Sequence, residues 1–192
     1  AAFALAGRGR RLAWWVSGFT LLGLGCFPAF TGHANGTEAL RPLTLIADIV
    51  HVWAVGVWVG GLAFVLYANR GWQAREGKGA QSLLPLLVPS FSPVAVASVG
   101  ALIVTGSISA WAHLSGFGDL LSTPYGQLLS LKLILVTGVF ALGLLNWRRL
   151  TPRLNEVSGQ RALTRAATAE LLIVQAVLIV TSILVVTPPP AH

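Results

Sequence analysis

An aspartate and a histidine, Asp48 and His51, stand three positions apart inside an almost wholly apolar run, residues 47–61. On a helix, residues three apart share one face with Cβ atoms about 5–6 Å apart, so both side chains can act on the same object. Neutral imidazole nitrogen and carboxylate oxygen are ligands for borderline divalent metal ions. The pair therefore predicts a metal site, although Asp48 could instead hydrogen-bond His51 or a helix end and hold helices together.

Further candidate ligands accompany this pair elsewhere in the chain. His33 and His113 could each add an imidazole nitrogen, so the predicted metal ligands are His33, Asp48, His51 and His113. Both added histidines also fit ordinary residues of a loop or helix end at a membrane interface. The accessory candidates are Cys26, Lys132 and Tyr125.

Lys132 complicates the metal interpretation. Counting the helical rise from Tyr125 places Lys132 about 10 Å deep in its apolar segment, level with Asp48 and His51. A buried ammonium group needs a counter-ion, and Asp48 is the natural candidate. That pairing competes with metal binding, because a charged lysine repels a cation, and the sequence leaves the two roles open.

Membrane-spanning helices must position these residues. Hydrophobic residues form 55% of the 192 residues and charged residues only 10%, more apolar surface than one soluble core could hide. A span needs about 20 helical residues. The predicted spans are Leu12–Phe30, Leu43–Ala68, Pro93–His113, Tyr125–Trp147 and Ala166–Val186. We expect an all-α polytopic membrane protein, with an N-terminal segment at 1–42 that holds the first helix and an outer loop. The last four spans, in residues 43–192, should form an up-and-down four-helix bundle.

Lysine and arginine orient these spans, because cytoplasmic loops carry an excess of both. The basic residues of the three segments predicted to lie inside are Arg8, Arg10, Arg11, Arg70, Arg75, Lys78, Arg148, Arg149, Arg153, Arg161 and Arg165. The N-terminus of the first span is then inside and the C-terminus outside, and all four histidines fall in the outer half. The net charge of +7 is therefore a topology signal and not a nucleic-acid footprint.

Other polar and small residues in the spans predict packing features. Glu170 is expected to form an interhelical salt bridge near Asn146, Arg148 and Arg149, with an ion contact as the alternative. Gly56 and Gly60 should let a neighbouring helix approach closely. Pro89 and Pro93 are expected to mark the inner start of the third span.

Several short motifs, in their order and spacing, resemble the copper resistance D family of membrane proteins. They are Asp48-Ile-Val-His51 with Val57–Leu62, Phe91-Ser92, Thr105-Gly106, Thr123–Gly126 with Leu131–Leu133, Asn146 before two arginines, and Thr187-Pro188-Pro189. The likeness covers roughly residues 43–190, and residues 31–34 resemble the segment that precedes this domain.

The resemblance implies a bacterial inner-membrane protein that takes copper across the membrane with a periplasmic copper-binding partner. The N-terminus of the first span would be cytoplasmic and the C-terminus periplasmic. Family members often carry further helices upstream or a fused periplasmic carrier, so we expect either a short member or the C-terminal part of a longer chain. Because the sequence has no methionine, copper(II) on His and Asp donors is favoured over copper(I).

Two other functions compete with copper transport. The family fold is similar to that of membrane four-helix b-type cytochromes, so a haem b electron carrier with His51 as an axial ligand is one alternative. His113 lies about 10 Å shallower than His51 by helical rise, which fits bis-histidine ligation poorly. The other alternative is a membrane scaffold with structural polar pairs. The sequence shows no catalytic constellation, so an enzyme is not expected.

Overall fold

The computed structural model describes residues 41–77, 81–114, 116 and 118–188, together with Thr20 and Gly23. The helices are α2 (Arg41–Glu76), α3 (Leu84–His113), α4 (Asp119–Ser122), α5 (Pro124–Arg149), the 3-10 helix η1 (Thr151–Arg153) and α6 (Val157–Val186). The described part of the chain contains no strand, and α2, α3, α5 and α6 are long and apolar enough to cross a membrane. The all-α prediction and its last four spans are confirmed. The first predicted span falls outside the described residues except for Thr20 and Gly23, and the division at residues 42 and 43 stays a prediction.

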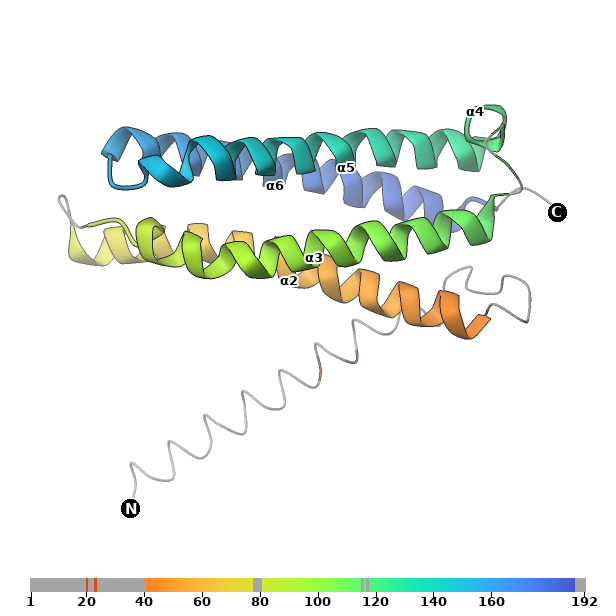
Figure 1. Cartoon of the computed structure of the whole chain (residues 1–192), viewed down its shortest axis with the longest axis horizontal. Helices are drawn as coiled ribbons and strands as arrows, with labels where there is room; N and C mark the ends of the chain where they lie inside the picture. Colours follow the sequence, from red (N-terminus) through yellow and green to blue (C-terminus); the bar gives the residue numbers. More distant parts are fainter. Residues whose placement is uncertain are drawn as a thin grey trace, which may run out of the picture.

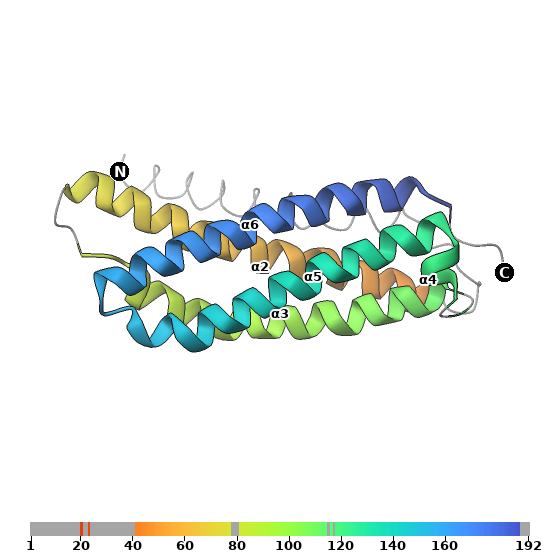
Figure 2. The same ribbon diagram turned by 90° about the horizontal axis from the view of Figure 1, so that it is seen from above.

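The four long helices form two antiparallel hairpins packed as two layers (Figure 1). Helices α2 and α3 form one hairpin, α5 and α6 form the other, and α2 also contacts α6. The view from above shows all four helices running along one common long direction (Figure 2). The short helix α4 lies at one end of the bundle, which we call the α4 end and at which α2 begins and α6 ends. The up-and-down arrangement follows from the short connections between successive helices.

Local sequence signals explain where several helices begin and end. Gly77 follows α2 with φ of 85°, the left-handed conformation that glycine tolerates, and its N–H donates to the Gln73 carbonyl at 3.1 Å. At the start of α5, the Thr123 hydroxyl accepts from the Gly126 N–H at 3.0 Å, and Pro124 occupies the first turn.

A buried asparagine of α2 caps the next helix. Asn69, only 4% exposed, accepts at Oδ1 from the Ser82 hydroxyl and from the Leu83 backbone N–H, each at 2.9 Å. The Ser82 hydroxyl oxygen in turn accepts from the Leu84 N–H at 3.2 Å. One side chain of α2 therefore satisfies donors at the start of α3. Sequence reasoning did not identify Asn69.

The helices extend further at one end than the predicted spans. Helix α2 continues to Glu76 instead of ending at Ala68, α3 begins at Leu84, and α6 begins at Val157. The prediction that Pro89 and Pro93 mark the start of the third span is wrong, because both lie inside α3. Hydropathy locates the apolar part of a helix, whereas α2 and α6 continue through polar turns and α3 continues through both prolines. At about 1.5 Å per residue, even a helix of 30 residues exceeds the roughly 30 Å hydrocarbon core.

Close contact between α2 and α3 occurs at a glycine other than those predicted. A Cβ atom built on Gly61 would lie 2.3 Å from the Phe91 ring, so any larger residue there would require that ring to move. Cβ atoms built on Gly56 and Gly60 would meet no atom within 4 Å, and both residues are exposed. The prediction of close helix packing at Gly56 and Gly60 is therefore wrong among the described helices.

Two apolar clusters fill opposite ends of the bundle. One consists of the buried residues Tyr125, Leu129 and Leu184 and lies toward the α4 end. The other consists of Val65, Leu84, Leu154 and Leu163 and lies toward the opposite end. Large apolar side chains also cover the outside of the helices, such as Ile46, Phe64 and Ile134, each at least 60% exposed. An apolar exterior on a helical bundle with its own interior core matches a lipid environment.

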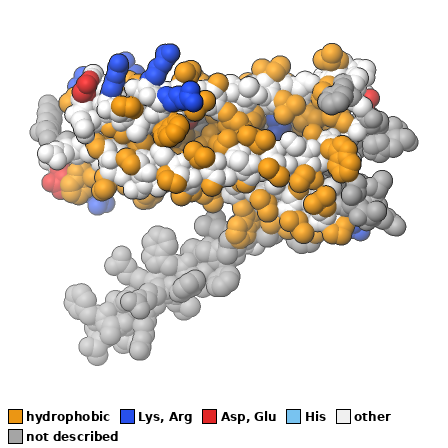
Figure 3. Space-filling view, viewed as in Figure 1, with side chains coloured by type: hydrophobic (Ala, Val, Ile, Leu, Met, Phe, Trp, Pro, Cys, Tyr) orange, Lys and Arg blue, Asp and Glu red, His pale blue; other side chains and the backbone are white. Residues whose placement is uncertain are grey.

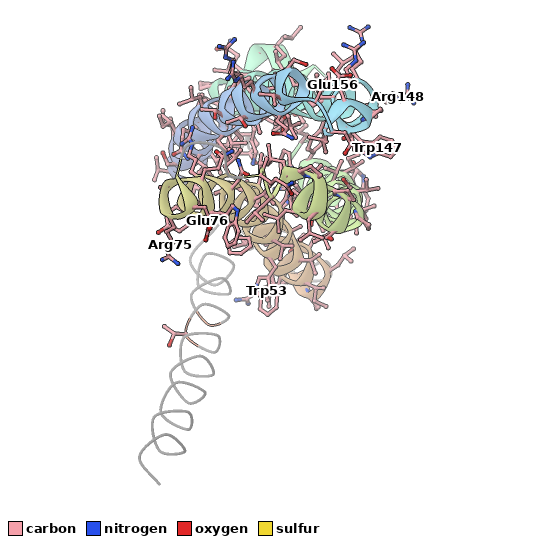
Figure 4. The ribbon with its side chains drawn as sticks, turned by 90° about the vertical axis from the view of Figure 1, so that its left-hand side faces the viewer. Trp53, Arg75, Glu76, Trp147, Arg148 and Glu156 are labelled. Atoms are coloured by element: carbon pink, nitrogen blue, oxygen red, sulfur yellow. The ribbon has the colours of Figure 1, made fainter. Side chains whose placement is uncertain are left out.

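The arginine-rich end of the bundle lies opposite α4. Figure 3 shows that most Lys and Arg side chains visible on one face gather there, and Figure 4 looks onto this end, with Arg75 and Arg148 at the periphery. The exposed arginines that belong to this end are Arg70, Arg75, Arg148, Arg149, Arg153, Arg161 and Arg165. Clustering at one end of a spanning bundle matches the asymmetry that sets membrane orientation.

Candidate metal centre

His51 of α2 is held by a threonine of α3. Its Nδ1 lies 2.9 Å from the Thr105 hydroxyl oxygen, and that hydroxyl lies 2.7 Å from the Ala101 carbonyl oxygen. A hydroxyl has one hydrogen, which Thr105 donates to the carbonyl, so His51 Nδ1–H is the donor to Thr105. Neutral His51 then has its lone pair on Nε2, to which no described residue donates. This is the arrangement in which a second hydrogen bond fixes a metal-binding imidazole.

The imidazole lies beside Gly106, the residue after Thr105. A Cβ atom on Gly106 would lie 3.7 Å from His51 Cε1, an ordinary van der Waals distance. Thr105 itself is only 5% exposed. The ring is therefore oriented by a buried hydroxyl and lies next to α3.

Asp48 contacts α3 one turn further toward the α4 end. Its Oδ1 accepts a hydrogen bond from the Ser109 hydroxyl at 3.1 Å. The residues three apart on α2 thus meet two residues four apart on α3, as expected for antiparallel helices whose contact faces repeat each turn. We call Asp48, His51, Thr105 and Ser109 the polar ladder.

Helix α5 brings a positive charge to the polar ladder. Lys132 is partly buried and interacts electrostatically with both Asp48 and His51. Tyr125, 9% exposed in the apolar cluster at the α4 end, interacts electrostatically with Asp48. The sequence-based pairing of Lys132 with Asp48 thus has a structural basis, and α5 contributes a charge at the same level along the bundle.

The structure places the predicted ligands as follows. Asp48 and His51 lie together on α2, and His113 is the last residue of α3, although its side chain is outside the described part. His33 and Cys26 fall outside the described residues. Among the side chains that are described, no three of His, Cys, Asp or Glu gather closely enough to hold a metal ion. The full four-ligand set stays a prediction.

Backbone positions on α3 separate the candidate histidines along the bundle. Thr105, which marks the level of His51, stands eight residues before His113, or about 12 Å of helical rise. Ser109, which marks the level of Asp48, stands four residues before His113, or about 6 Å. His113 is therefore nearer in level to Asp48 than to His51.

Sequence reasoning named Thr105 only within the Thr105-Gly106 motif and did not name Ser109, so neither hydroxyl was predicted to hold the pair. Ser and Thr in apolar helices usually bond to their own backbone, as Ser107 does to the Ile103 carbonyl at 2.8 Å. Thr105 and Ser109 share one helix face at a spacing of four, which is the signal that could have found them. Ser107, between them, is exposed.

A second buried polar contact joins α5 and α6 toward the arginine-rich end. Glu170 is 5% exposed, and the Asn146 side-chain amide donates to its Oε1. The salt bridge predicted with Arg148 or Arg149 is wrong, because both arginines are exposed and no ion pair joins either to Glu170. A long, strongly hydrated side chain at a helix end turns outward, whereas the shorter asparagine reaches the neighbouring helix.

Comparisons with known proteins give the family of the chain. The sequence model described as copper resistance protein D matches residues 85–184, which run from α3 to near the end of α6. Copper transport protein CutJ of Bacillus subtilis (strain 168) is 30% identical over 163 residues, 84% of this chain and 28% of that protein.

A second curated protein is also similar to this chain. NADH-quinone oxidoreductase subunit N of Leptospira interrogans serogroup Icterohaemorrhagiae serovar Lai (strain 56601) is 32% identical over 127 residues, 60% of this chain and 24% of that protein. The chain thus spans about a quarter of the length of these curated relatives. No solved structure matches the chain. Because the family model covers more than half of its residues, the chain belongs to the copper resistance protein D family.

Proposed function

We propose that this chain binds copper in the half of the bundle that contains the polar ladder and passes it across the bacterial inner membrane as part of a copper uptake protein. The observation that carries this proposal is the hydrogen bond between His51 Nδ1 and Thr105, which leaves Nε2 as a metal-binding atom. Membership in the copper resistance protein D family and the likeness to a protein named for copper transport support copper as the cargo.

The ligands act in sequence along the bundle in this proposal. His113 and Asp48 lie nearer in level to each other and serve as the outer position, with His33 as a further donor and Cys26 and Tyr125 as accessory groups. His51 lies deeper and serves as the next position, because Thr105 sets its level. Asp48 connects the two positions, since it stands three residues from His51 on the same helix face.

The donor chemistry favours copper(II). Imidazole and carboxylate suit a divalent ion, whereas copper(I) prefers thioether and thiolate sulfur, and the sequence contains no methionine and one cysteine. We propose that the α4 end faces the periplasm, because the arginines gather at the other end, and that a periplasmic copper carrier delivers the ion there. Transport without a reaction on the cargo is the proposed activity, so no enzyme chemistry is assigned.

A haem b electron carrier is the alternative function. Bis-histidine ligation needs two histidines at one level on facing helices. The level of His51 and the position of His113 differ by about 12 Å of helical rise, so this pair does not meet that requirement. A purified chain with a Soret absorption band would support haem over copper.

Copper uptake into proteoliposomes tests the proposed function. We expect His51→Ala and Asp48→Ala each to abolish most uptake and to weaken copper(II) binding by at least about tenfold, because each removes one ligand atom. Val50→Ala, at an exposed site between them on the same helix, is the matched control and should transport normally. Normal copper binding and uptake in both ligand variants would refute the proposed site.

A further inference from the structure

Glu170 is the buried acidic residue that the proposed copper path does not use. It lies on α6, is 5% exposed, and faces α5, from which the Asn146 amide donates to its Oε1. A Cβ atom on Gly143, one turn before Asn146, would lie 3.6 Å from Glu170 Oε2. The carboxyl group thus lies against α5, with the Asn146 amide at Oε1 and Gly143 beside Oε2.

No described basic side chain pairs with this carboxyl group. On α5, the nearest charged residues are Arg148 and Arg149, which are exposed, and Lys132, fourteen residues away from Asn146 and at the level of the polar ladder. On α6 itself, Arg161 and Arg165 are exposed, as is Arg153 of η1.

The other helices add no charge at this level. On α2, Tyr67 is the one titratable residue between His51 and Arg70, and it is 78% exposed. Helix α3 has no acidic, basic or tyrosine residue from Leu84 to Ala112. The surroundings that the described helices give to Glu170 are therefore neutral.

A neutral, buried setting selects the protonated form of a carboxyl group. An ionised carboxylate inside a spanning bundle is costly unless a cation or several donors compensate it. The protonated form still offers a carbonyl oxygen to which the Asn146 amide can donate, and it adds an O–H group. Burial and the lack of a nearby cation thus favour a proton on Glu170, while the Asn146 amide orients the carboxyl group.

A short distance separates this site from the arginine-rich end. Asn146 stands three residues before Arg149, the last residue of α5, which is about 4.5 Å of helical rise. We propose that Glu170 holds a proton within the membrane and exchanges it with water at the arginine-rich end, with Asn146 orienting the carboxyl group. This proton site is independent of the copper proposal, because it shares no residue with the polar ladder.

Infrared difference spectroscopy of the full chain in lipid nanodiscs, without added copper, tests the proposal. We expect the carbonyl stretch of a protonated carboxylic acid at neutral pH, its shift in heavy water and its loss at alkaline pH. Glu170→Gln should remove this band, and it should fold because the amide preserves shape and neutrality. Glu156→Gln, at an exposed glutamate, should keep the band.

A second variant keeps the test decisive if Glu170→Gln does not fold. Asn146→Leu should keep the band but shift its frequency, because the hydrogen bond to Oε1 is lost. A wild-type spectrum without the band at neutral pH, or an unchanged band in either variant, would overturn the proposal. Loss of the band when copper(II) is added at constant pH would also overturn it, since Glu170 would then be a metal ligand.

Discussion

The two buried polar contacts of this bundle differ in whether they leave a nitrogen lone pair that could bind a cation. The polar ladder joins α2 to α3 and lies near the charge of Lys132, and its imidazole keeps Nε2 as a lone-pair donor. The Glu170–Asn146 contact joins α5 to α6 in neutral surroundings, and the Asn146 amide donates a hydrogen bond to the carboxyl group. The first arrangement is the proposed cation site, whereas the second is the proposed proton site.

Polarity in a membrane helix therefore does not by itself define function. Both contacts satisfy buried polar groups and link neighbouring helices, as a scaffold would require. They differ in whether a lone pair remains to bind a cation and in whether a charged side chain lies nearby. Four substitutions test this separation, in order of decreasing expected effect.

Removal of the Thr105 hydroxyl should have the largest effect. Thr105→Val keeps the volume but leaves Nδ1 without its acceptor, so we expect copper(II) affinity to fall about 10-fold to 100-fold. Ser107→Ala, at an exposed hydroxyl two residues away, is the matched control. Copper titration with a competing chelator measures both, and equal affinities would show that Thr105 does not orient the ligand.

Loss of the Asn146 amide should affect stability and not copper binding. Asn146→Leu leaves a buried carboxyl oxygen without its donor, so we expect a loss of about 1–3 kcal/mol in the free energy of unfolding. Reversible unfolding in detergent measures this change, with exposed Asn155→Leu as control. A large fall in copper affinity in Asn146→Leu would break the distinction between the two contacts.

Neutralisation of Lys132 should strengthen copper binding. A unit charge at an effective dielectric constant of about 20 contributes on the order of 1–4 kcal/mol of repulsion to a nearby cation, so Lys132→Met should raise affinity about tenfold. The exposed Arg148→Met variant controls for lost net charge. Weaker binding in Lys132→Met would instead identify the lysine as a counter-ion that positions Asp48.

Deletion of the Ser109 hydroxyl should have the smallest effect. Ser109→Ala removes one donor to Asp48, so we expect copper affinity to change by only a few-fold, equivalent to about 1 kcal/mol. The same titration measures it beside Thr105→Val. An effect of Ser109→Ala larger than that of Thr105→Val would place the main ligand at Asp48 and not at His51.

Much of the fold could be predicted because the membrane imposes it. Apolar length alone gave the four described spans, and the asymmetry of arginine matched one end of the bundle. The lengths of the helices at that end were underestimated, because residues outside the hydrocarbon need not be apolar to stay helical. Pro89 and Pro93 misled for a different reason: a spanning helix can continue through proline when its freed backbone groups find other partners.

The site could be predicted only in part, because contacts between helices depend on register. The shared helix face of Asp48 and His51 followed from their spacing, but their partners Thr105 and Ser109 required knowing how α2 and α3 face each other. The mistaken salt bridge at Glu170 has the same origin. Charge suggested Arg148 and Arg149, whereas side-chain reach and direction selected Asn146.

The cap that Asn69 forms has a consequence at the far end of its hairpin. By accepting from both Ser82 and Leu83, Asn69 fixes the axial register of α2 against α3, and the Gly61 contact with Phe91 preserves that register midway. A slip of one helical turn, about 5.4 Å, would carry His51 away from the Thr105 hydroxyl. Asn69, which lies far from the proposed copper site, thus helps to determine which side chains of α2 and α3 lie opposite one another at that site.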